Sequence, residues 1–407
     1  KLMNSIEKLT VSASKSYLQR ALAIAALSEG ISVLNEVSWC NDSIAAKNII
    51  ENLGCKIEEN NRILLINQQN ISFNNREFNA NEAGLSIRMF SPIFALSNHE
   101  INFKGEGSLN NRPIQLIADA LFQLGVIIQS NNGLLPIKIK GPIKSGVINI
   151  DGSLSSQLLT GLLIALPLVK GDSVINVHNL KSIPYIDMTV KIMEHFGVKV
   201  KNINYKTFKI KGNQKYQATT YNIEGDWSGG AFFLVCGAVK GSIEITNLSI
   251  SSMQADKIII NALKLAGAKI TIKKESLIVE KNKLNAFYFD ATNCPDLFPP
   301  LVCLASQCKG ITEIKGISRL THKESDRADV LKKEFIKMGI YITFKNDSMY
   351  ITGNKPQPCT IDSHNDHRIA MAGGIMNLFC DGEIKIENKE AINKSYPDFF
   401  EQLRIFQ

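Results

Sequence analysis

Polar and ionisable side chains gather in six short segments of this 407-residue chain, and each segment leads directly into an apolar stretch. The segments are SASKSYLQR, EAGLSIRMF, GSLSSQLL, EGDWSGG, NCPDLFPP and HNDHRIAMAGG. Hydroxyl, amide and guanidinium groups bind phosphate and carboxylate, and the carboxylates among these residues can transfer protons. The residue types therefore predict a site for a substrate that carries several negative charges.

The apolar stretches that follow predict buried helices, so each cluster should stand at a helix N-terminus. The clusters centre on Lys15, Gly84, Gln157, Asp226, Asp296 and Asp366, which lie 14 to 16 residues before turns at Gly30, Asn98, Gly171, Gly241, Gly310 and Gly382. Helix N-termini carry free N–H groups and about half a positive charge, so they bind anions. We expect each turn residue, the asparagine included, to adopt the left-handed conformation.

A second glycine series shows that the chain is built from repeats. Its members follow one another at steps of 70 to 72 residues: Gly54, Gly125, Gly197, Gly267 and Gly339. Six units of about 70 residues account for the chain. We predict an α/β fold, an inside-out α/β barrel in two domains, each with three repeats whose buried helices are walled by sheets.

The position of the chain ends sets the expected domain boundaries. The sixth repeat stops at Gln407 without its closing glycine and strand, so we expect the N-terminal strand in IEKLTVSA to complete it. Residues 13–225 should then form the first domain, and residues 1–12 with 226–407 the second.

Cations distinguish these helix starts from ordinary capped ones. Seven of them lie at or close to the predicted starts: Lys15, Arg20, Arg88, Arg112, Arg327, Arg368 and Lys394. A cation at a helix N-terminus opposes the helix dipole unless an anion joins it, which favours an anion-binding site. Simple capping remains the better interpretation of Asn41-Asp42-Ser43 and of Asp226.

Composition and missing motifs exclude several classes of protein. No zinc-type histidine pair, acidic Mg²⁺ cluster, Walker loop or dinucleotide fingerprint occurs, so we expect no metal and no cofactor. Eight scattered cysteines favour reduced thiols in a cytoplasmic compartment, and no apolar run is long enough to span a membrane. The diffuse net charge of +8 suits an anionic partner, either a phosphorylated metabolite or a nucleic acid.

Several motifs resemble those of one enzyme family. SKSYLQRAL, DGSLSSQLLTGLL, SIPYID, HKESDR, NDHRIAM and KSYPDFFEQL occur in this order over nearly the whole chain. They resemble the 5-enolpyruvylshikimate-3-phosphate synthases, the enolpyruvyl transferases of the shikimate pathway. The resemblance implies two domains, each with three-fold pseudo-symmetry, closing over shikimate 3-phosphate and phosphoenolpyruvate. It implies small-molecule substrates, no nucleic-acid or membrane partner, and a monomer.

The resemblance also implies roles for single residues. Asp296, Glu324 and Lys15 would be catalytic. Shikimate 3-phosphate would contact Lys15, Ser16, Arg20, Ser155, Ser156, Gln157, Ser182, Tyr185, Asp296 and Lys323. Phosphoenolpyruvate would contact Lys15, Gly84, Arg112, Gln157, Arg327, Arg368 and Lys394.

The chain departs from the family pattern beside the phosphoenolpyruvate residues. Leu85 and Met89 stand where the family has Thr and Pro, which predicts reduced sensitivity to glyphosate. Glu82 stands in place of Asn and adds a negative charge near an anion site. Thr321 replaces an expected Arg, which leaves the role of Arg319 open.

Two other functions remain to be weighed. A UDP-N-acetylglucosamine enolpyruvyl transferase normally has a cysteine before its Arg-Pro, and GEGSLNNRP contains none. A nucleic-acid-binding relative of RNA 3′-phosphate cyclase would carry basic stripes interleaved with exposed aromatic side chains. Here both tryptophans are isolated and the basic residues recur at predicted helix starts, so enolpyruvyl transfer to shikimate 3-phosphate is the favoured function.

Overall fold

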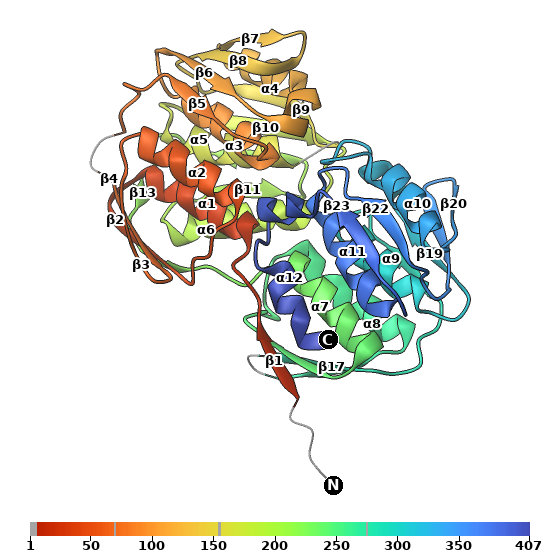
Figure 1. Ribbon diagram of the computed structural model, residues 1–407. Coiled ribbons are helices and arrows are strands. Elements are labelled where there is room, and N and C mark those ends of the chain that lie inside the picture. The colour runs from red at the N-terminus through yellow and green to blue at the C-terminus, as the bar shows by residue number, and fades with distance from the viewer. Residues whose placement is uncertain (1–5, 69–70, 154–155, 274–275) are drawn as a thin grey trace. The chain divides into compact units, whose positions relative to one another are not determined.

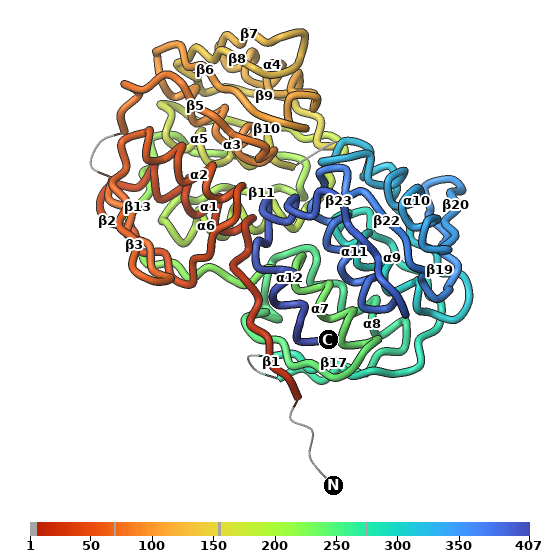
Figure 2. Tube along the Cα trace, in the orientation of Figure 1, coloured from red at the N-terminus to blue at the C-terminus, as the bar shows by residue number. Residues whose placement is uncertain are grey.

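The computed structural model describes residues 6–68, 71–153, 156–273 and 276–407, and Ser155 lies outside these ranges. Contacts within the chain divide it into two compact units. Lys15–Ile223 form the N-terminal unit, and the residues up to Ser14 join Glu224–Gln407 in the C-terminal unit. Figures 1 and 2 trace both units along the chain, with the first strand in red among the green and blue elements of the C-terminal unit.

Three strongly apolar helices form the centre of the N-terminal unit: α1 (Lys15–Ala26), α3 (Gly84–Phe94) and α5 (Gln157–Ala165). Nearly all their side chains are buried, because each helix has apolar residues on every one of its faces. Three further helices bury one face: α2 (Asn41–Asn52), α4 (Gln115–Phe122) and α6 (Ile183–His195). The sequence pattern of alternating central and amphipathic helices is therefore confirmed in this unit.

Three sheets surround these helices among the described residues. The first combines β13 (Tyr216–Gln217), β14 (Thr220–Asn222), β2 (Ser28–Asn35), β4 (Ile63–Gln68) and β3 (Lys56–Asn60). The second has the order β5 (Glu77–Asn79), β6 (Glu100–Lys104), β8 (Leu134–Lys140) and β7 (Ile127–Asn131). The third has the order β9 (Val147–Asp151), β10 (Ser173–His178), β12 (Thr207–Ile210) and β11 (Val200–Ile203).

One connection pattern generates these sheets. A parallel pair such as β5 and β6 needs a crossover, which α3 supplies, and this places the buried helix behind its own sheet. An antiparallel hairpin such as β7 and β8 then completes the sheet. Its turn at Asn132 and Gly133 has φ of 52° and 78°, the positive pair that a tight hairpin turn requires.

The C-terminal unit repeats the plan around α7 (Trp227–Lys240), α9 (Phe298–Ser306) and α11 (His367–Phe379). The accompanying helices are α8 (Ile259–Ala266), α10 (Arg327–Lys337) and α12 (Phe399–Gln402). The sheets are β1 (Glu7–Thr10), β15 (Ile243–Thr246), β17 (Ser276–Glu280), β16 (Lys269–Ile272); β18 (Tyr288–Asp290), β19 (Ile311–Lys315), β21 (Ser348–Thr352), β20 (Ile342–Lys345); and β22 (Cys359–Asp362), β23 (Ile384–Glu387).

Short 3₁₀ helices join these elements in both units. They are η1 (Gly107–Asn111), η2 (Leu166–Leu168), η3 (Ala255–Ile258), η4 (Pro295–Leu297), η5 (Ile317–Arg319), η6 (Lys389–Lys394) and η7 (Leu403–Phe406). The predicted two-domain α/β fold is confirmed. Its barrel-like units consist of separate open sheets around buried helices, and among the described strands no sheet closes on itself.

The N-terminal strand completes a different repeat from the predicted one. β1 pairs in parallel with β15, in register from Glu7 opposite Ile243 to Thr10 opposite Thr246. It therefore joins the fourth repeat, and the sixth repeat keeps the two-stranded sheet of β22 and β23. The physical reason is an open place beside β15, because β14, the strand that precedes α7, pairs with β2 in the N-terminal unit.

The turn prediction is right for one glycine series and partly wrong for the other. Gly54, Gly125, Gly197, Gly267 and Gly339 all have positive φ, as do Gly30, Gly171 and Gly310. Asn98, Gly241 and Gly382 are not left-handed. Their helices end by other means: α3 closes with turns at Leu96 and Ser97, φ at Gly241 is an extended 171°, and Cys380 terminates α11 in an extended conformation.

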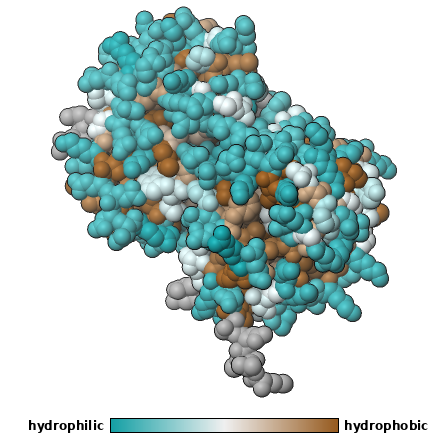
Figure 3. Space-filling model, viewed as in Figure 1, coloured by the Kyte–Doolittle hydropathy of each residue, from teal (hydrophilic) through white to brown (hydrophobic). Residues whose placement is uncertain are grey.

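The viewed surface of the N-terminal unit is mainly hydrophilic, whereas apolar side chains gather over the lower middle of the C-terminal unit (Figure 3). Among the described residues, no helix combines the length and the apolar character that a membrane crossing would require.

Candidate functional site

The structure confirms that all six polar clusters stand at the starts of buried helices. Helices α1, α3 and α5 begin at Lys15, Gly84 and Gln157. The other three clusters also stand at helix N-termini. Asp226 and Asp366 are the N-caps of α7 and α11, and Asp296 lies in η4, just before α9. Each repeat thus presents its polar residues where free backbone N–H groups are concentrated.

Two of these carboxylates act as caps. Asp226 accepts hydrogen bonds from the N–H groups of Ser228 and Gly229, both at 3.1 Å, as the capping interpretation predicts. Asp366 accepts from the N–H of Arg368 at 3.0 Å. At α2, by contrast, the Ser43 hydroxyl accepts from the N–H of Cys40, so Asp42 is available for another partner.

That partner is Lys15. The distance from Lys15 Nζ to Asp42 Oδ2 is 2.6 Å, and both side chains are largely buried. The sequence did not predict this ion pair, because capping was the favoured interpretation of Asn41-Asp42-Ser43. The general signal was present, since a buried cation at a helix start needs an anion.

Arg20 lies in the same unit and is almost completely buried in α1. Its Nε donates to the Thr189 hydroxyl at 2.9 Å, and Nη1 donates to the carbonyl of Ser16 at 2.9 Å. The guanidinium lies 5.8 Å from the centre of the Tyr185 ring. Burial lowers the pKa of Arg20 to about 10, so the group is still charged at neutral pH. The structure therefore groups the predicted residues Ser16, Arg20 and Tyr185.

Ser156 and Ser182 flank helices α5 and α6. Ser156 is the buried residue before α5, and its carbonyl accepts from the N–H of Thr160 at 3.0 Å. Ser182 is the N-cap of α6 and has a φ of 55°, which is a strained value for serine. Backbone strain of this kind is concentrated at functional sites, where the surrounding structure enforces it.

Two guanidinium groups converge on Gly84. A Cβ added to Gly84 would lie 2.6 Å from Arg112 Nη1 and 3.0 Å from Arg88 Nη1. Arg88 Nη1 donates to the Gly84 carbonyl at 3.2 Å and to Gln157 Oε1 at 2.9 Å. Arg112 Nε is buried and has no hydrogen-bond partner among the described residues. Arg88, which the resemblance did not assign, thus connects the starts of α3 and α5.

Arg327 organises the cluster of the C-terminal unit. Its side chain is completely buried and pairs with three carboxylates. The distances are 2.9 Å to Asp296, 2.7 Å to Glu324 and 2.9 Å to Asp366. Burial acts to lower the pKa of Arg327, but these carboxylates raise it well above its ordinary value. Arg327 therefore carries a permanent charge that gathers both predicted catalytic carboxylates.

Asp296 is surrounded by cations. It lies 3.4 Å from Lys323 Nζ and 3.6 Å from Arg368 Nη2, in addition to its bond with Arg327. Burial lowers the pKa of Lys323, although Asp296 opposes this effect. Burial also acts to lower the pKa of Arg368, and Asp296 reverses the shift so that the pKa is raised. In this structure a carboxylate of the protein itself therefore lies beside three cations.

Lys394 holds the loop that precedes α11. It is buried, and its Nζ donates to the carbonyl of Asn365 at 2.6 Å. Arg319, whose role the sequence left open, donates to the carbonyl of Thr292 at 3.2 Å. The structure thus gives both residues a backbone partner.

One group of side chains has the spacing of metal ligands within the described part of the chain: Glu324, Asp366 and His367. Arg327 Nη2 already lies 2.7 Å from Glu324 and 3.0 Å from Asp366. A metal cation at this position would be repelled by the guanidinium at short range. The residues present therefore suit an arginine-bound carboxylate pair better than a metal centre.

Asp256, in η3, is a further buried acid near this cluster. Neither of its carboxylate oxygens has a hydrogen-bond partner among the described residues, although the Ser228 hydroxyl lies near enough to lower its pKa. Burial, followed by the charge of Asp296, raises the pKa of Asp256 to about 7, against the effect of Arg368.

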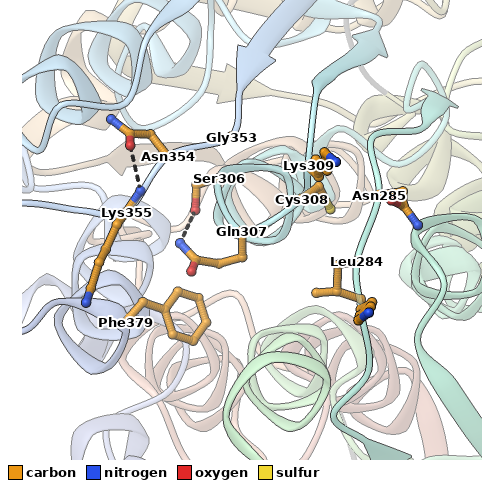
Figure 4. Close-up of a pocket in the computed structure, with 11 residues that line it drawn as sticks. Leu284, Asn285, Ser306, Gln307, Cys308, Lys309, Gly353, Asn354, Lys355 and Phe379 are labelled. Carbon is orange, nitrogen blue, oxygen red and sulfur yellow. Dashed lines mark hydrogen bonds between the residues drawn. The ribbon is translucent and has the colours of Figure 1, made fainter.

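Two cavities lie away from these side chains, one in each unit. In the C-terminal unit, a cavity of about 510 Å³ at the carboxyl end of α9 is lined by Ser306–Lys309, Leu284, Phe379 and other residues (Figure 4). In the N-terminal unit, a cavity of about 580 Å³ includes Leu96–His99 after α3. Both cavities lie at the same position of their repeats, after the central helix, although the residues differ. The cavity at this position therefore follows from the geometry of the repeat. No predicted site residue that the structure describes lines either cavity.

The fold and the cation-rich helix starts define a two-domain α/β enzyme built from six repeats and suited to anionic substrates. A sequence profile of the family EPSP synthase (3-phosphoshikimate 1-carboxyvinyltransferase) matches residues 5–403. The chain belongs to this family.

Individual relatives support the family assignment. A 3-phosphoshikimate 1-carboxyvinyltransferase of Clostridium novyi is 35% identical over 405 residues, covering 97% of this chain and 93% of the relative. One from Clostridium acetobutylicum is 36% identical over 398 residues, covering 96% and 92%. The solved structure of an EPSP synthase from Acinetobacter baumannii is similar with a TM-score of 0.82 at 26% identity, covering 98% of this chain and 95% of that one.

Proposed function

We propose that this protein transfers the enolpyruvyl group of phosphoenolpyruvate to the 5-hydroxyl of shikimate 3-phosphate and releases phosphate. Family membership supports the reaction class. The observation that carries the proposal is the pair of carboxylates, Asp296 and Glu324, held on the buried guanidinium of Arg327. Such a pair can move protons while neighbouring cations stabilise charge on carboxylate and phosphate.

The residues of the C-terminal unit suit the proton transfers. The 5-hydroxyl must lose a proton as its oxygen attacks C2 of phosphoenolpyruvate, and C3 must gain one. The tetrahedral adduct then expels phosphate as the new methyl group loses a proton. We assign the hydroxyl proton to Asp296 and the C3 proton to Glu324, with Arg327, Arg368 and Lys394 as partners of the phosphoenolpyruvate anion.

Binding of phosphoenolpyruvate would exchange one anion for another. Arg368 lies 3.6 Å from Asp296, a distance too long for a strong hydrogen bond, so the substrate carboxylate can take the better position on this guanidinium. Asp296 would lose part of its cationic surroundings at that moment and become a stronger base. Binding of phosphoenolpyruvate would thereby activate Asp296 to take the proton from the 5-hydroxyl of shikimate 3-phosphate.

The residues of the N-terminal unit suit a phosphorylated ring. We assign shikimate 3-phosphate to Lys15, Ser16, Arg20, Ser156, Gln157, Ser182 and Tyr185, with Ser155 as a further candidate outside the described residues. Asp296 and Lys323 are further proposed contacts of this substrate. We assign the phosphate of phosphoenolpyruvate to Lys15, Gly84, Arg112 and Gln157. We further propose a monomer that acts without a nucleic-acid partner.

Phosphate release from the two proposed substrates tests this function. We expect turnover of shikimate 3-phosphate with phosphoenolpyruvate in the presence of EDTA, because acid–base groups and cationic side chains supply the chemistry described above. The control replaces shikimate 3-phosphate by UDP-N-acetylglucosamine. Turnover with UDP-N-acetylglucosamine but not with shikimate 3-phosphate would contradict the assignment. It would favour a UDP-N-acetylglucosamine enolpyruvyl transferase.

Replacement of Gly84 by alanine should weaken phosphoenolpyruvate binding selectively. The new Cβ would meet the guanidinium groups of Arg112 and Arg88, which are the ends of flexible side chains, so they can move while the fold persists. Loss of one hydrogen bond to a charged group costs about 1.5–3 kcal/mol, or roughly a ten- to hundred-fold rise in KM for phosphoenolpyruvate. Steady-state kinetics with each substrate varied in turn measure the effect.

The matched control is Gly146→Ala in the same unit, where the nearest atom to an added Cβ is an ordinary 3.6 Å away on Leu124. This variant should leave both KM values unchanged. An equal rise in KM for both substrates in Gly84→Ala would contradict the assignment of Gly84 to phosphoenolpyruvate alone.

A further inference from the structure

Glu82 makes a specific contact with a distant loop of the N-terminal unit. It lies two residues before α3, and its Oε1 accepts a hydrogen bond from the N–H of Ser108 at 3.1 Å. Ser108 belongs to η1, the short helix whose following residue is Arg112. The first N–H groups of a helix have no partner inside it, so a carboxylate there is favourable. Glu82 therefore satisfies the start of the segment that carries Arg112.

Neighbouring contacts hold the same two segments together. The N–H of Glu106 donates to the carbonyl of Asn81 at 2.6 Å. The Asn79 side-chain amide donates to Glu106 Oε1, also at 2.6 Å. Glu82 thus adds to a set of hydrogen bonds that hold the chain before α3 against η1 and the residues before it.

Gly107 shows how closely the carboxylate is fitted. Its φ of 52° is left-handed, and a Cβ at this position would overlap the carboxylate of Glu82. Both conditions require glycine. The space that the missing side chain leaves is filled by the carboxylate, so the contact is part of how this loop is built.

The negative charge of Glu82 would weaken anion binding at this position unless the side chain also stabilises the site. Glu82 lies two residues before Gly84, where the guanidinium groups of Arg112 and Arg88 converge, and a negative charge beside an anion site weakens anion binding. The carboxylate of Glu82 offsets this effect, because it holds the loop that ends at Arg112 through its hydrogen bond with Ser108. Arg112 needs such support because its Nε has no hydrogen-bond partner among the described residues.

We propose that Glu82 is a positioning residue that holds the segment 107–112 so that the Arg112 guanidinium stays against Gly84 and can bind phosphoenolpyruvate. This inference rests on the proposed function for the identity of the ligand. The contact between Glu82 and Ser108 stands independently of it. Glu82 itself need not touch the substrate.

Two substitutions separate the hydrogen bond from the charge. Glu82→Ala removes the acceptor and should raise KM for phosphoenolpyruvate about tenfold, with kcat and the affinity for shikimate 3-phosphate within about twofold of the unmodified protein. Glu82→Gln keeps an oxygen that can accept from Ser108 and should restore KM to within about twofold. The control is Glu58→Ala, which removes an exposed carboxylate from β3 of the same unit and should change nothing.

Hydrogen exchange of the ligand-free protein gives a readout that does not depend on turnover. The Ser108 amide should exchange faster in Glu82→Ala and at the unmodified rate in Glu82→Gln. If the unmodified protein shows no turnover, the proposed function fails while the exchange experiment still tests the contact. Faster exchange with an unchanged KM for phosphoenolpyruvate would overturn the positioning role, as would a Glu82→Gln variant that behaves like Glu82→Ala.

Discussion

Replacement of Arg327 by alanine is expected to destabilise the C-terminal unit by about 3–5 kcal/mol, the usual effect of breaking a buried ion pair from one side. Arg327 is completely buried and binds Asp296, Glu324 and Asp366 at 2.7 to 2.9 Å. Asp366 is itself fully buried, so removal of the guanidinium leaves a carboxylate without its counter-ion in a site closed to water. The variant should also lose activity, because both proposed catalytic carboxylates lose their common anchor.

Urea unfolding followed by tryptophan fluorescence can measure this effect in the right unit. Trp227 is completely buried in α7 of the C-terminal unit, and a Trp39→Phe background removes the signal of the other unit. The control is Lys269→Ala in the same unit, which breaks a surface pair with Glu280 at 3.0 Å and should cost no more than about 1 kcal/mol. Equal stability of the two variants would show that the Arg327 cluster does not support the fold.

Replacement of Asp296 by asparagine is expected to lower kcat by about a hundred- to ten-thousand-fold, the range that general acid–base groups contribute. Asparagine keeps the shape and one oxygen acceptor, so Arg327 retains a partner there in addition to Glu324 and Asp366. Stability should therefore change little. Calorimetry should show that both substrates still bind, which separates a catalytic loss from a binding loss.

Glu324→Gln should give a loss of similar size and a different isotopic signature. If Glu324 delivers the proton to C3, this variant should incorporate deuterium from D₂O into the methyl group of the intermediate more slowly than Asp296→Asn does. The matched control is Asp290→Asn, which alters a half-exposed carboxylate 3.7 Å from Lys315 and should leave kcat within about twofold. Full activity of Asp296→Asn would remove this residue from the proposed mechanism.

Much of the architecture could be predicted because its signals are local. The steps between glycines, the apolar character of each central helix and the polar residues before it lie within one repeat of about 70 residues. Helix ends and caps depend on backbone angles and on neighbours a few residues away. The starts of α1, α3 and α5 therefore agree with the sequence interpretation. The turns at Asn98, Gly241 and Gly382 did not follow it, because several local geometries can end a helix.

The tertiary structure alone decided which charges meet. Lys15 forms an ion pair with Asp42, 27 residues away, and Arg327 forms one with Asp366, 39 residues away. β1 pairs with β15, some 236 residues further along the chain. Residue types at helix starts specify that cations and carboxylates will be present. Their pairing depends on how whole helices pack, because Coulomb energies in a buried site change steeply over an ångström, and one-dimensional spacing does not contain that distance.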